Sequence, residues 1–309
     1  MFEKIVGNEQ VKVYLSKAIK NNTLPHAILL SGPAGVGKSL FAKTLAASLL
    51  QTTEHKIEAE IHPDFHPLRP ESKSGLHAID TLRTLIDEVH SAPFESSGKV
   101  FLIYDAERMQ TASANALLKT LEEPNPDTTL ILLTEHLSEM IPTIRSRAVV
   151  LSLRPIAEVD IVAFLKAKGL PEKWAKMGQG SIGKAVELAT APSLEKDLFS
   201  LLGERPIYPK LLLGLEKIEA SIEDEDPVKK NRNVEYLFTA FLTWYRDQNA
   251  RGLGMDREEL FFPDEEGVLF PLPKMDVVMK RVDEARLNFQ RNIKFSTCLE
   301  CLISSLSGC

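Results

Sequence analysis

The first half of the chain alternates short apolar runs with segments whose apolar residues recur every three or four positions. The apolar runs predict five strands, at 27–31, 64–68, 100–104, 129–134 and 149–153. The periodic segments predict helices at 39–50 and 111–123, the second ending before Pro124. Asn8 stands where it can cap a further helix that begins its apolar stripe at Val11. Strands that alternate with helices are typical of an α/β fold with a mainly parallel sheet.

Beyond Arg154 the strand pattern largely disappears. Residues 156–190 instead predict three short helices, because glycine and proline at 169–171 and glycines at 178–180 interrupt the periodic pattern.

From Pro192 onward the sequence is helical and apolar. Polar or proline-rich loops are predicted at 223–233 and 251–274, and a last helix from Met275 to about Ser305. The chain is therefore expected to form three domains, at residues 1–154, 155–191 and 192–309.

The composition is that of an ordinary globular protein. Of 309 residues, 44% are hydrophobic and 26% are charged, which is enough to build a sizeable core. A formal net charge of −6 gives no overall attraction to nucleic acid or to an anionic membrane, although a local basic face remains compatible with it. No apolar run reaches about 18 residues, and the first ten residues lack the apolar core of a signal peptide, so a cytoplasmic protein with no membrane contact is expected.

All three cysteines, Cys298, Cys301 and Cys309, lie among the last dozen residues and form no disulfide framework. The first two would sit one helical turn apart, but no second cysteine pair or nearby histidine completes a four-ligand metal site. We interpret them as small buried apolar residues.

Residues 32–39, Gly-Pro-Ala-Gly-Val-Gly-Lys-Ser, match the phosphate-loop pattern G-x-x-x-x-G-K-[ST] in full. A predicted strand precedes the loop and a helix follows it, so backbone N–H groups and the positive end of the helix can converge on phosphate oxygens. Lys38 would reach the β- and γ-phosphates of ATP, and Ser39 would bind the magnesium ion. The predicted nucleotide-binding residues are Gly32, Gly35, Val36, Gly37, Lys38 and Ser39. The alternative is a glycine turn that binds no ligand.

The strand that should complete this site lacks the usual acidic pair. In working enzymes of this class an apolar strand ends in Asp-Glu, where Asp holds magnesium and Glu orients the attacking water. Here the strand runs from Val100 to Tyr104-Asp105-Ala106, so either Tyr104 or Asp105 takes the Asp position. The next position then holds Asp105 or Ala106, and neither arrangement is the normal pair. We therefore expect ATP with magnesium to bind weakly or unproductively, with little or no hydrolysis; the alternative is a usable atypical site.

Three further segments are distinctive: Asp105–Met109, Ala114–Pro124 and Pro142–Arg147, supported by His62-Pro-Asp64 and by the opening Phe2–Gln10. They resemble bacterial clamp-loader ATPases of the AAA+ class, and among these the delta-prime subunits of DNA polymerase III most closely. The resemblance covers residues 1–190 well, whereas the C-terminal third matches only in being helical and of suitable length.

The resemblance implies an AAA+ P-loop NTPase domain with a parallel sheet, a small helical lid and an all-helical collar. It also implies a hetero-oligomeric ring with gamma/tau and delta subunits that opens the sliding clamp and loads it on primed DNA. In that family the arginine of a Ser-Arg-Cys motif reaches into the ATP site of a neighbouring subunit. Ser146-Arg147-Ala148 matches its first two residues. Arg147 is therefore the candidate trans arginine finger, and the alternative is a surface arginine paired with local carboxylates.

Three departures from the family pattern bear on the mechanism. Residues 51–61 contain none of the zinc-binding cysteines that family members often carry there, so no zinc site is expected. Thr134 stands at the position of the γ-phosphate sensor, although threonine is also common at strand ends. Gly183 replaces the second sensor arginine of an active loader subunit. The leading hypothesis is a stator-like subunit; the alternative is an active gamma-like ATPase or another AAA+ motor.

Overall fold

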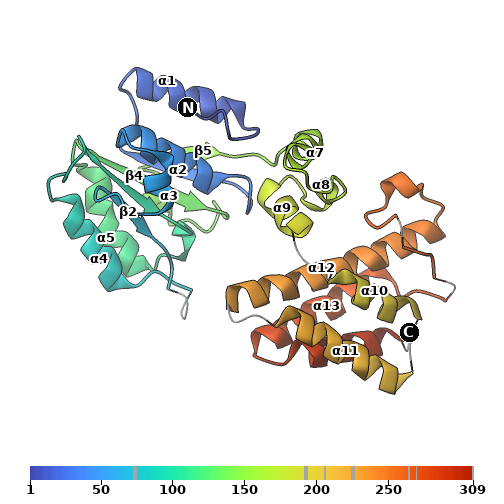
Figure 1. Ribbon diagram of the computed structural model, residues 1–309. Helices are drawn as coiled ribbons and strands as arrows, with labels where there is room; N and C mark the ends of the chain where they lie inside the picture. The colour runs from blue at the N-terminus through green and yellow to red at the C-terminus, as the bar shows by residue number, and fades with distance from the viewer. Residues whose placement is uncertain are drawn as a thin grey trace. The chain divides into compact units, whose positions relative to one another are not determined.

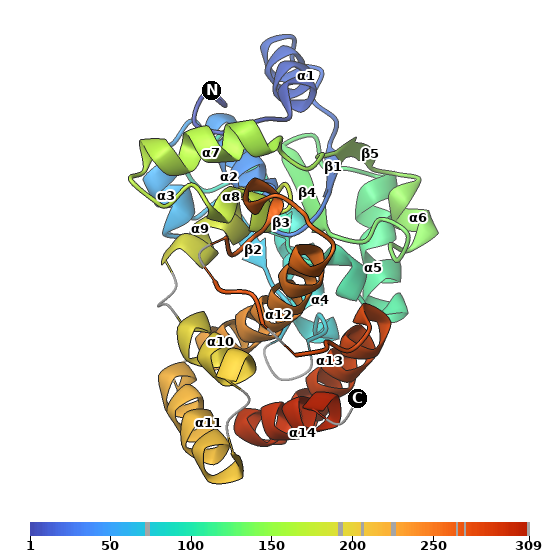
Figure 2. The same ribbon diagram turned by 90° about the vertical axis from the view of Figure 1, so that its right-hand side faces the viewer.

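The computed structural model describes residues 1–71, 75–190, 194–204, 207–223, 227–263, 265–268 and 270–307. Backbone contacts divide the chain into two compact units, residues 1–186 and 187–309, which Figures 1 and 2 show from two sides. The domain boundaries expected near residues 154 and 191 stay predictions.

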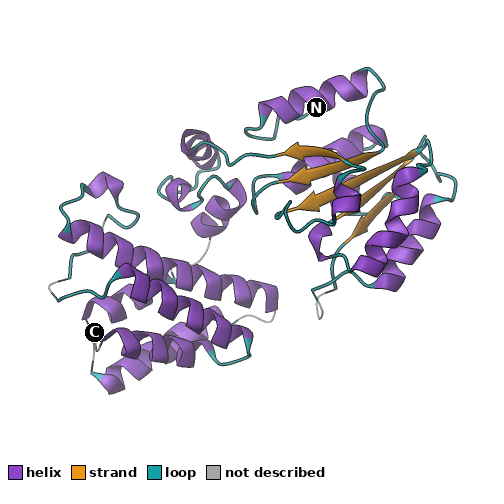
Figure 3. Cartoon of the chain, turned by 180° about the vertical axis from the view of Figure 1, so that it is seen from behind, coloured by secondary structure: helices purple, strands orange, loops and turns teal. Residues whose placement is uncertain are grey.

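The first unit is built on a parallel sheet, drawn in orange in Figure 3. Its five strands lie in the order β2-β3-β4-β1-β5. The α/β fold with a parallel sheet is thus confirmed, and each strand lies within one residue of its predicted bounds. The strands are β1 (Ala27–Ser31), β2 (Phe65–Leu68), β3 (Lys99–Ile103), β4 (Thr128–Thr134) and β5 (Val149–Ser152).

Helices cover both faces of this sheet. One face packs against α1 (Glu9–Lys20), α2 (Lys38–Leu49) and α3 (Glu54–Glu58). The other packs against α4 (Ile79–Val89), α5 (Thr111–Glu122) and α6 (Pro142–Arg145). Successive side chains of β3 therefore alternate between the two cores: Val100 and Leu102 join the α2 side, whereas Phe101 joins the α5 side.

Asn8 begins α1 as expected, but its predicted capping bond is wrong. The residue has a left-handed backbone (φ 56°) and no side-chain hydrogen bond to its own helix. Its amide nitrogen instead donates to the carbonyl of Arg154 at 3.1 Å, and the Arg154 N–H donates to its amide oxygen at 2.7 Å. The pair ties the start of the chain to the segment that follows β5.

The segment after β5 forms the three short helices expected of the lid. They are α7 (Glu158–Ala167), α8 (Trp174–Met177) and α9 (Ile182–Thr190). The interruptions fall where glycine was expected to place them, since Gly169 and Gly180 both have positive φ.

In the second unit, every regular element that the structure describes is helical. The helices are α10 (Glu195–Glu204), α11 (Tyr208–Ile222), α12 (Pro227–Gly252), the 3-10 turn η2 (Arg257–Glu259), α13 (Met275–Gln290) and α14 (Phe295–Ser307). α14 packs against both α11 and α13, and α12 packs against α10 and α13 (Figure 2).

Two boundaries predicted in this unit are wrong. The loop expected at 223–233 is shorter, because α12 already begins at Pro227. The single helix expected from Met275 to Ser305 is two helices. Asn292 takes a left-handed conformation (φ 64°), and the Ile293 N–H bonds back to the Asn288 carbonyl at 3.2 Å, which ends α13.

Of the C-terminal cysteines, Cys298 is buried and Cys301 is exposed, so the interpretation as two buried residues holds for Cys298 alone. Burial raises the pKa of the Cys298 thiol to about 11. Cys309 lies outside the described residues. No helix in the described ranges combines the length and the apolar character needed to cross a membrane.

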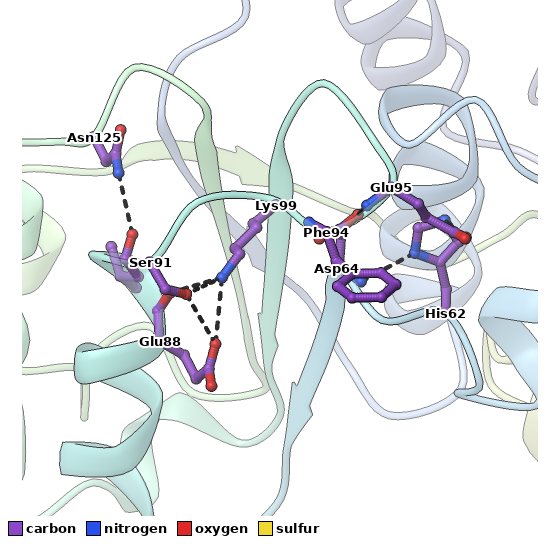
Figure 4. Close-up of polar contacts among 9 residues, drawn as sticks. His62, Asp64, Glu88, Ser91, Phe94, Glu95, Lys99 and Asn125 are labelled. Atoms are coloured by element: carbon purple, nitrogen blue, oxygen red, sulfur yellow. Dashed lines mark hydrogen bonds and ion pairs between the residues drawn. The ribbon is translucent and has the colours of Figure 1, made fainter.

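The His62-Pro-Asp64 motif anchors the loop that leads into β3 (Figure 4). The buried Asp64 carboxylate accepts three successive backbone N–H groups, from Phe94 at 2.6 Å, Glu95 at 2.9 Å and Ser96 at 2.8 Å. Burial raises the pKa of Asp64, but these three bonds and nearby His62 outweigh it and leave the pKa below its ordinary value. This motif is therefore structural and lies outside the nucleotide site.

Candidate functional site

The phosphate loop connects β1 to α2, and its lysine is folded onto the loop itself. Lys38 is buried, and its Nζ donates to the carbonyls of Gly32 at 2.6 Å and Pro33 at 2.9 Å. Ser39 in the first turn of α2 is exposed. The loop thus offers the amino end of a 12-residue helix, an exposed hydroxyl and an internal cation, which together fit a phosphate group.

Acidic side chains surround Lys38. The Glu135 carboxylate lies 3.6 Å from its Nζ, and Glu107 and Asp105 lie close enough to act on its charge. Burial lowers the pKa of Lys38, while these three carboxylates oppose that shift. Glu107 also accepts the Glu135 N–H at 3.2 Å through Oε1, whereas its Oε2 is buried with no hydrogen-bond partner. Sequence reasoning missed both Glu107 and Glu135.

Tyr104 directly follows β3, and its side chain packs against the same core as Leu102, on the side of α2. This packing favours the register that puts Tyr104 at the expected magnesium position. The guanidinium of Arg69 lies 4.3 Å from the centre of its ring, and Arg69 is itself held by Glu60. Burial raises the pKa of Tyr104, so the phenol stays neutral. A neutral phenol beneath a guanidinium does not fit the role of a magnesium-binding carboxylate.

In that register Asp105 stands at the position expected for the catalytic glutamate. It has a left-handed backbone (φ 46°) and begins the short helix η1 (Ala106–Arg108). The buried His77 contacts this turn through Nε2, which lies 2.8 Å from the Tyr104 carbonyl and 3.3 Å from the Asp105 carbonyl. No pattern in the sequence connects His77 with this turn, 27 residues away.

Thr134, the predicted sensor, lies at the end of β4 beside the phosphate loop. It pairs with Ser31 across the sheet, and its carbonyl accepts the Gly32 N–H at 3.2 Å. Its buried hydroxyl accepts the His136 N–H at 3.2 Å. The residue therefore supports the turn after β4 next to the loop.

The lid helix α9 begins directly on the phosphate loop. The Gly183 N–H donates to the Gly35 carbonyl at 3.1 Å. A side chain at Gly183 would meet the Gly35 backbone at 3.0 Å, and one at Gly35 would meet Ser181 Oγ at 2.1 Å. The lid thus approaches the loop closely: a side chain at Gly35 would clash with Ser181, and one at Gly183 would make a tight contact with the Gly35 backbone.

Arg147 lies apart from this group. The phosphate loop follows the carboxyl end of β1, whereas Arg147 precedes the amino end of β5. Because the two strands are parallel, the loop and Arg147 lie at opposite ends of the strands. Its Nη2 lies 2.5 Å from the Glu122 carboxylate, and its Nη1 donates to the Thr143 carbonyl at 3.1 Å and to Ser146 Oγ at 3.3 Å. Such an ion pair agrees with the alternative interpretation of Arg147 as a paired surface residue.

The structure therefore brings Gly32–Ser39, Asp105 and Thr134 together and leaves Arg147 outside. Within the described ranges, no three His, Cys, Asp or Glu side chains group in a way that could hold a metal ion. The residues present fit a phosphate, whereas Tyr104 removes the carboxylate that would complete a magnesium site.

Comparison with known proteins gives the family. The family described as "DNA polymerase III, delta subunit" matches residues 7–157. The DNA polymerase III subunit delta' of Pseudomonas aeruginosa is 31% identical over 258 residues, which cover 79% of this chain and 75% of that protein. The chain belongs to the clamp-loader family of DNA polymerase III subunits.

Clamp-loader subunits other than delta' are also similar to this chain. The DNA polymerase III subunit gamma of Buchnera aphidicola is 34% identical over 177 residues, or 53% of this chain. The match spans 48% of that subunit, about half its length. A solved DNA polymerase III gamma subunit-related protein from Thermotoga maritima has the same fold, with a TM-score of 0.52 and 17% identity over 94% of this chain and 97% of that one. The expected AAA+ fold with a helical C-terminal region is confirmed.

Proposed function

We propose that this chain is a delta'-type subunit of the DNA polymerase III clamp loader. It assembles with gamma or tau and delta subunits in a ring that loads the sliding clamp on primed DNA, and it lends Arg147 to a neighbour's ATP site. Its own site holds ATP weakly and contributes little hydrolysis. The supporting observation is the position of Tyr104, whose neutral side chain replaces the magnesium-binding acid next to an otherwise complete phosphate loop.

Two further features support a minor role for the local nucleotide site. Gly183 supplies no cation where an active subunit needs one, and its N–H is bonded to the phosphate loop. Asp105 is shorter than the glutamate that orients water, and catalytic geometry tolerates little displacement. An arginine supplied in trans, by contrast, accelerates phosphoryl transfer by roughly 10³–10⁵-fold. Arg147 stands at the opposite end of the strands, where a neighbour can reach it.

An active gamma-like ATPase is the second candidate function. The intact loop favours it, together with the three carboxylates of Asp105, Glu107 and Glu135 near Lys38. In this case one of these acids would take over the role of the missing Asp-Glu pair.

DNA-stimulated ATP hydrolysis by a reconstituted loader separates the two. We expect Arg147→Ala in this subunit to lower the stimulated rate at least tenfold, about 1.4 kcal/mol of transition-state stabilisation, and Lys38→Ala to change it little. Arg145→Ala is the matched control, because Arg145 is also exposed and lies two residues away. Equal large losses from Lys38→Ala and Arg147→Ala, with assembly intact, would favour the active ATPase.

A further inference from the structure

The guanidinium of Arg147 is neutralised within its own subunit. Glu122, the last residue of α5, lies 2.5 Å from Nη2, and the remaining contacts of Nη1 are with Thr143 and Ser146 of the preceding turn. In this arrangement the side chain curls over the end of α6. Its charge faces a carboxylate, so it offers little net charge to a neighbouring subunit.

The end of α5 is a favourable place for such a contact. The carbonyl groups at a helix C-terminus carry partial negative charge, which a carboxylate such as Glu122 increases and a cation relieves. α5 and α6 pack against each other, so Arg147 can reach this point without rearrangement of the backbone. The contact therefore follows from the local electrostatics of two packed helices.

The pair is nevertheless weak enough to exchange. The side chains of Arg147 and Glu122 are 35% and 49% exposed, and exposed ion pairs contribute little because water and salt screen them. A triphosphate presents several negative charges to the guanidinium, whereas Glu122 presents one. A neighbour's nucleotide therefore competes successfully for Arg147 when the two subunits come together.

We propose that Glu122 is a positioning residue that holds Arg147 against its own subunit until the triphosphate of a neighbour displaces it. The inference rests on the proposed function, because it requires Arg147 to act in trans. It adds that Arg147 is restrained as long as no neighbour's triphosphate lies within its reach. Releasing the restraint raises the DNA-free rate and leaves the DNA-stimulated rate unchanged.

The test uses loaders reconstituted with Glu122→Gln, which keeps the shape of the side chain and removes its charge. We expect the DNA-free ATPase rate to rise roughly 1.5- to 5-fold, the range that a surface ion pair supports. Glu123→Gln is the matched control, because Glu123 is the exposed neighbour at the end of the same helix. The gain should vanish when Arg147→Ala is combined with Glu122→Gln.

A second readout does not depend on ATP hydrolysis. Phenylglyoxal modification of the isolated full chain, quantified by peptide mass spectrometry, reports how freely the Arg147 guanidinium reacts. Glu122→Gln should raise the modification rate at Arg147 and leave that of Arg145 unchanged, while Glu123→Gln should change neither. A change in overall stability would move both arginines together.

The outcomes distinguish the inference from the proposed function. If Arg147→Ala abolishes DNA stimulation but Glu122→Gln changes neither the DNA-free rate nor the modification rate, the restraint is refuted and the trans arginine survives. A gain from Glu122→Gln that persists when Arg147→Ala is added also refutes the restraint. A loss of the DNA-stimulated rate from Glu122→Gln alone, equal to the loss from Arg147→Ala, refutes it as well. If Arg147→Ala has no effect on the loader, both proposals fail.

Discussion

Tyr104 and Arg69 together determine what the end of β3 can bind. The tyrosine removes a negative charge, and the guanidinium 4.3 Å from its ring adds a positive one. A magnesium ion at this point would have to approach the Arg69 guanidinium without a carboxylate at position 104 to bind it. The substitution of one residue is thus reinforced by a second residue from a different part of the chain.

This pairing predicts how the magnesium site can be rebuilt. Tyr104→Asp alone should have little effect on the magnesium dependence of nucleotide binding, because Arg69 will form an ion pair with the new carboxylate. Tyr104→Asp combined with Arg69→Ala should make nucleotide binding magnesium-dependent, with affinity roughly tenfold higher in magnesium than in EDTA, a difference of about 1.4 kcal/mol. Isothermal titration calorimetry with ADP and ATP measures the affinity in magnesium and in EDTA. Equal magnesium dependence in the wild type would contradict this account of Tyr104.

At this scale the sequence predicted the loop residues but only part of their surroundings. The phosphate loop is a local pattern, so the sequence alone is enough to name Gly32–Ser39. The register of Tyr104 needed the alternation of β3 side chains between two cores, which a buried apolar strand does not reveal. Arg69 and His77 come from other parts of the chain, and nothing in their local sequence points to the site. Glu135 directly follows the predicted sensor Thr134, but no pattern marks its carboxylate as a partner of Lys38.

At the scale of secondary-structure elements, the start of helix α9 packs against the phosphate loop. Gly35 has φ +70° and lies against Ser181, so a side chain there costs both backbone strain and space. Gly169 has nearly the same backbone, φ +69°, with nothing within 4 Å of an added Cβ. The two glycines therefore separate the cost of conformation from the cost of packing the lid.

We expect Gly169→Ala to lower the free energy of unfolding by about 1–2 kcal/mol, through backbone strain alone. Gly35→Ala should lower it by about 1–2 kcal/mol more, because its Cβ meets the lid. Urea unfolding of the full chain measures both, and Ser181→Ala should recover part of the extra loss at Gly35. Equal losses at the two glycines would mean that the lid does not press on the loop in solution.

Element boundaries were predictable where the turn chemistry was distinct. Gly169 and Pro171, and then Gly178 and Gly180, marked the breaks between lid helices correctly. The break at Asn292 was missed because Phe289 and Ile293 continue the helical spacing of apolar residues across it. Asparagine tolerates the left-handed conformation that ends a helix, so it was the available signal. Pro227 was likewise a start signal for α12 within a polar stretch that looked like a loop.

At the scale of the whole molecule, an arginine that acts in trans can function only if its subunit is held beside a neighbour. Arg147 and the phosphate loop lie at opposite ends of the strands of one sheet, so a ring can place the arginine of one subunit near the loop of the next. The proposed collar of residues 192–309 would hold the ring together. Within it, Ile207, Tyr208 and Leu213 at the start of α11 are exposed apolar side chains.

If the collar carries the subunit contacts, α11 is the helix at which a charge should weaken them. Leu213 is 67% exposed, so Leu213→Glu should leave the free energy of unfolding of the isolated chain within about 0.5 kcal/mol. Its assembly with gamma or tau and delta subunits, measured by analytical ultracentrifugation, should nevertheless weaken at least tenfold, because a carboxylate would be buried in an apolar contact. Leu253→Glu is the matched control, since Leu253 is 86% exposed and follows α12. Normal assembly by Leu213→Glu would place the subunit contacts away from this face of α11, while the role of Arg147 would still stand.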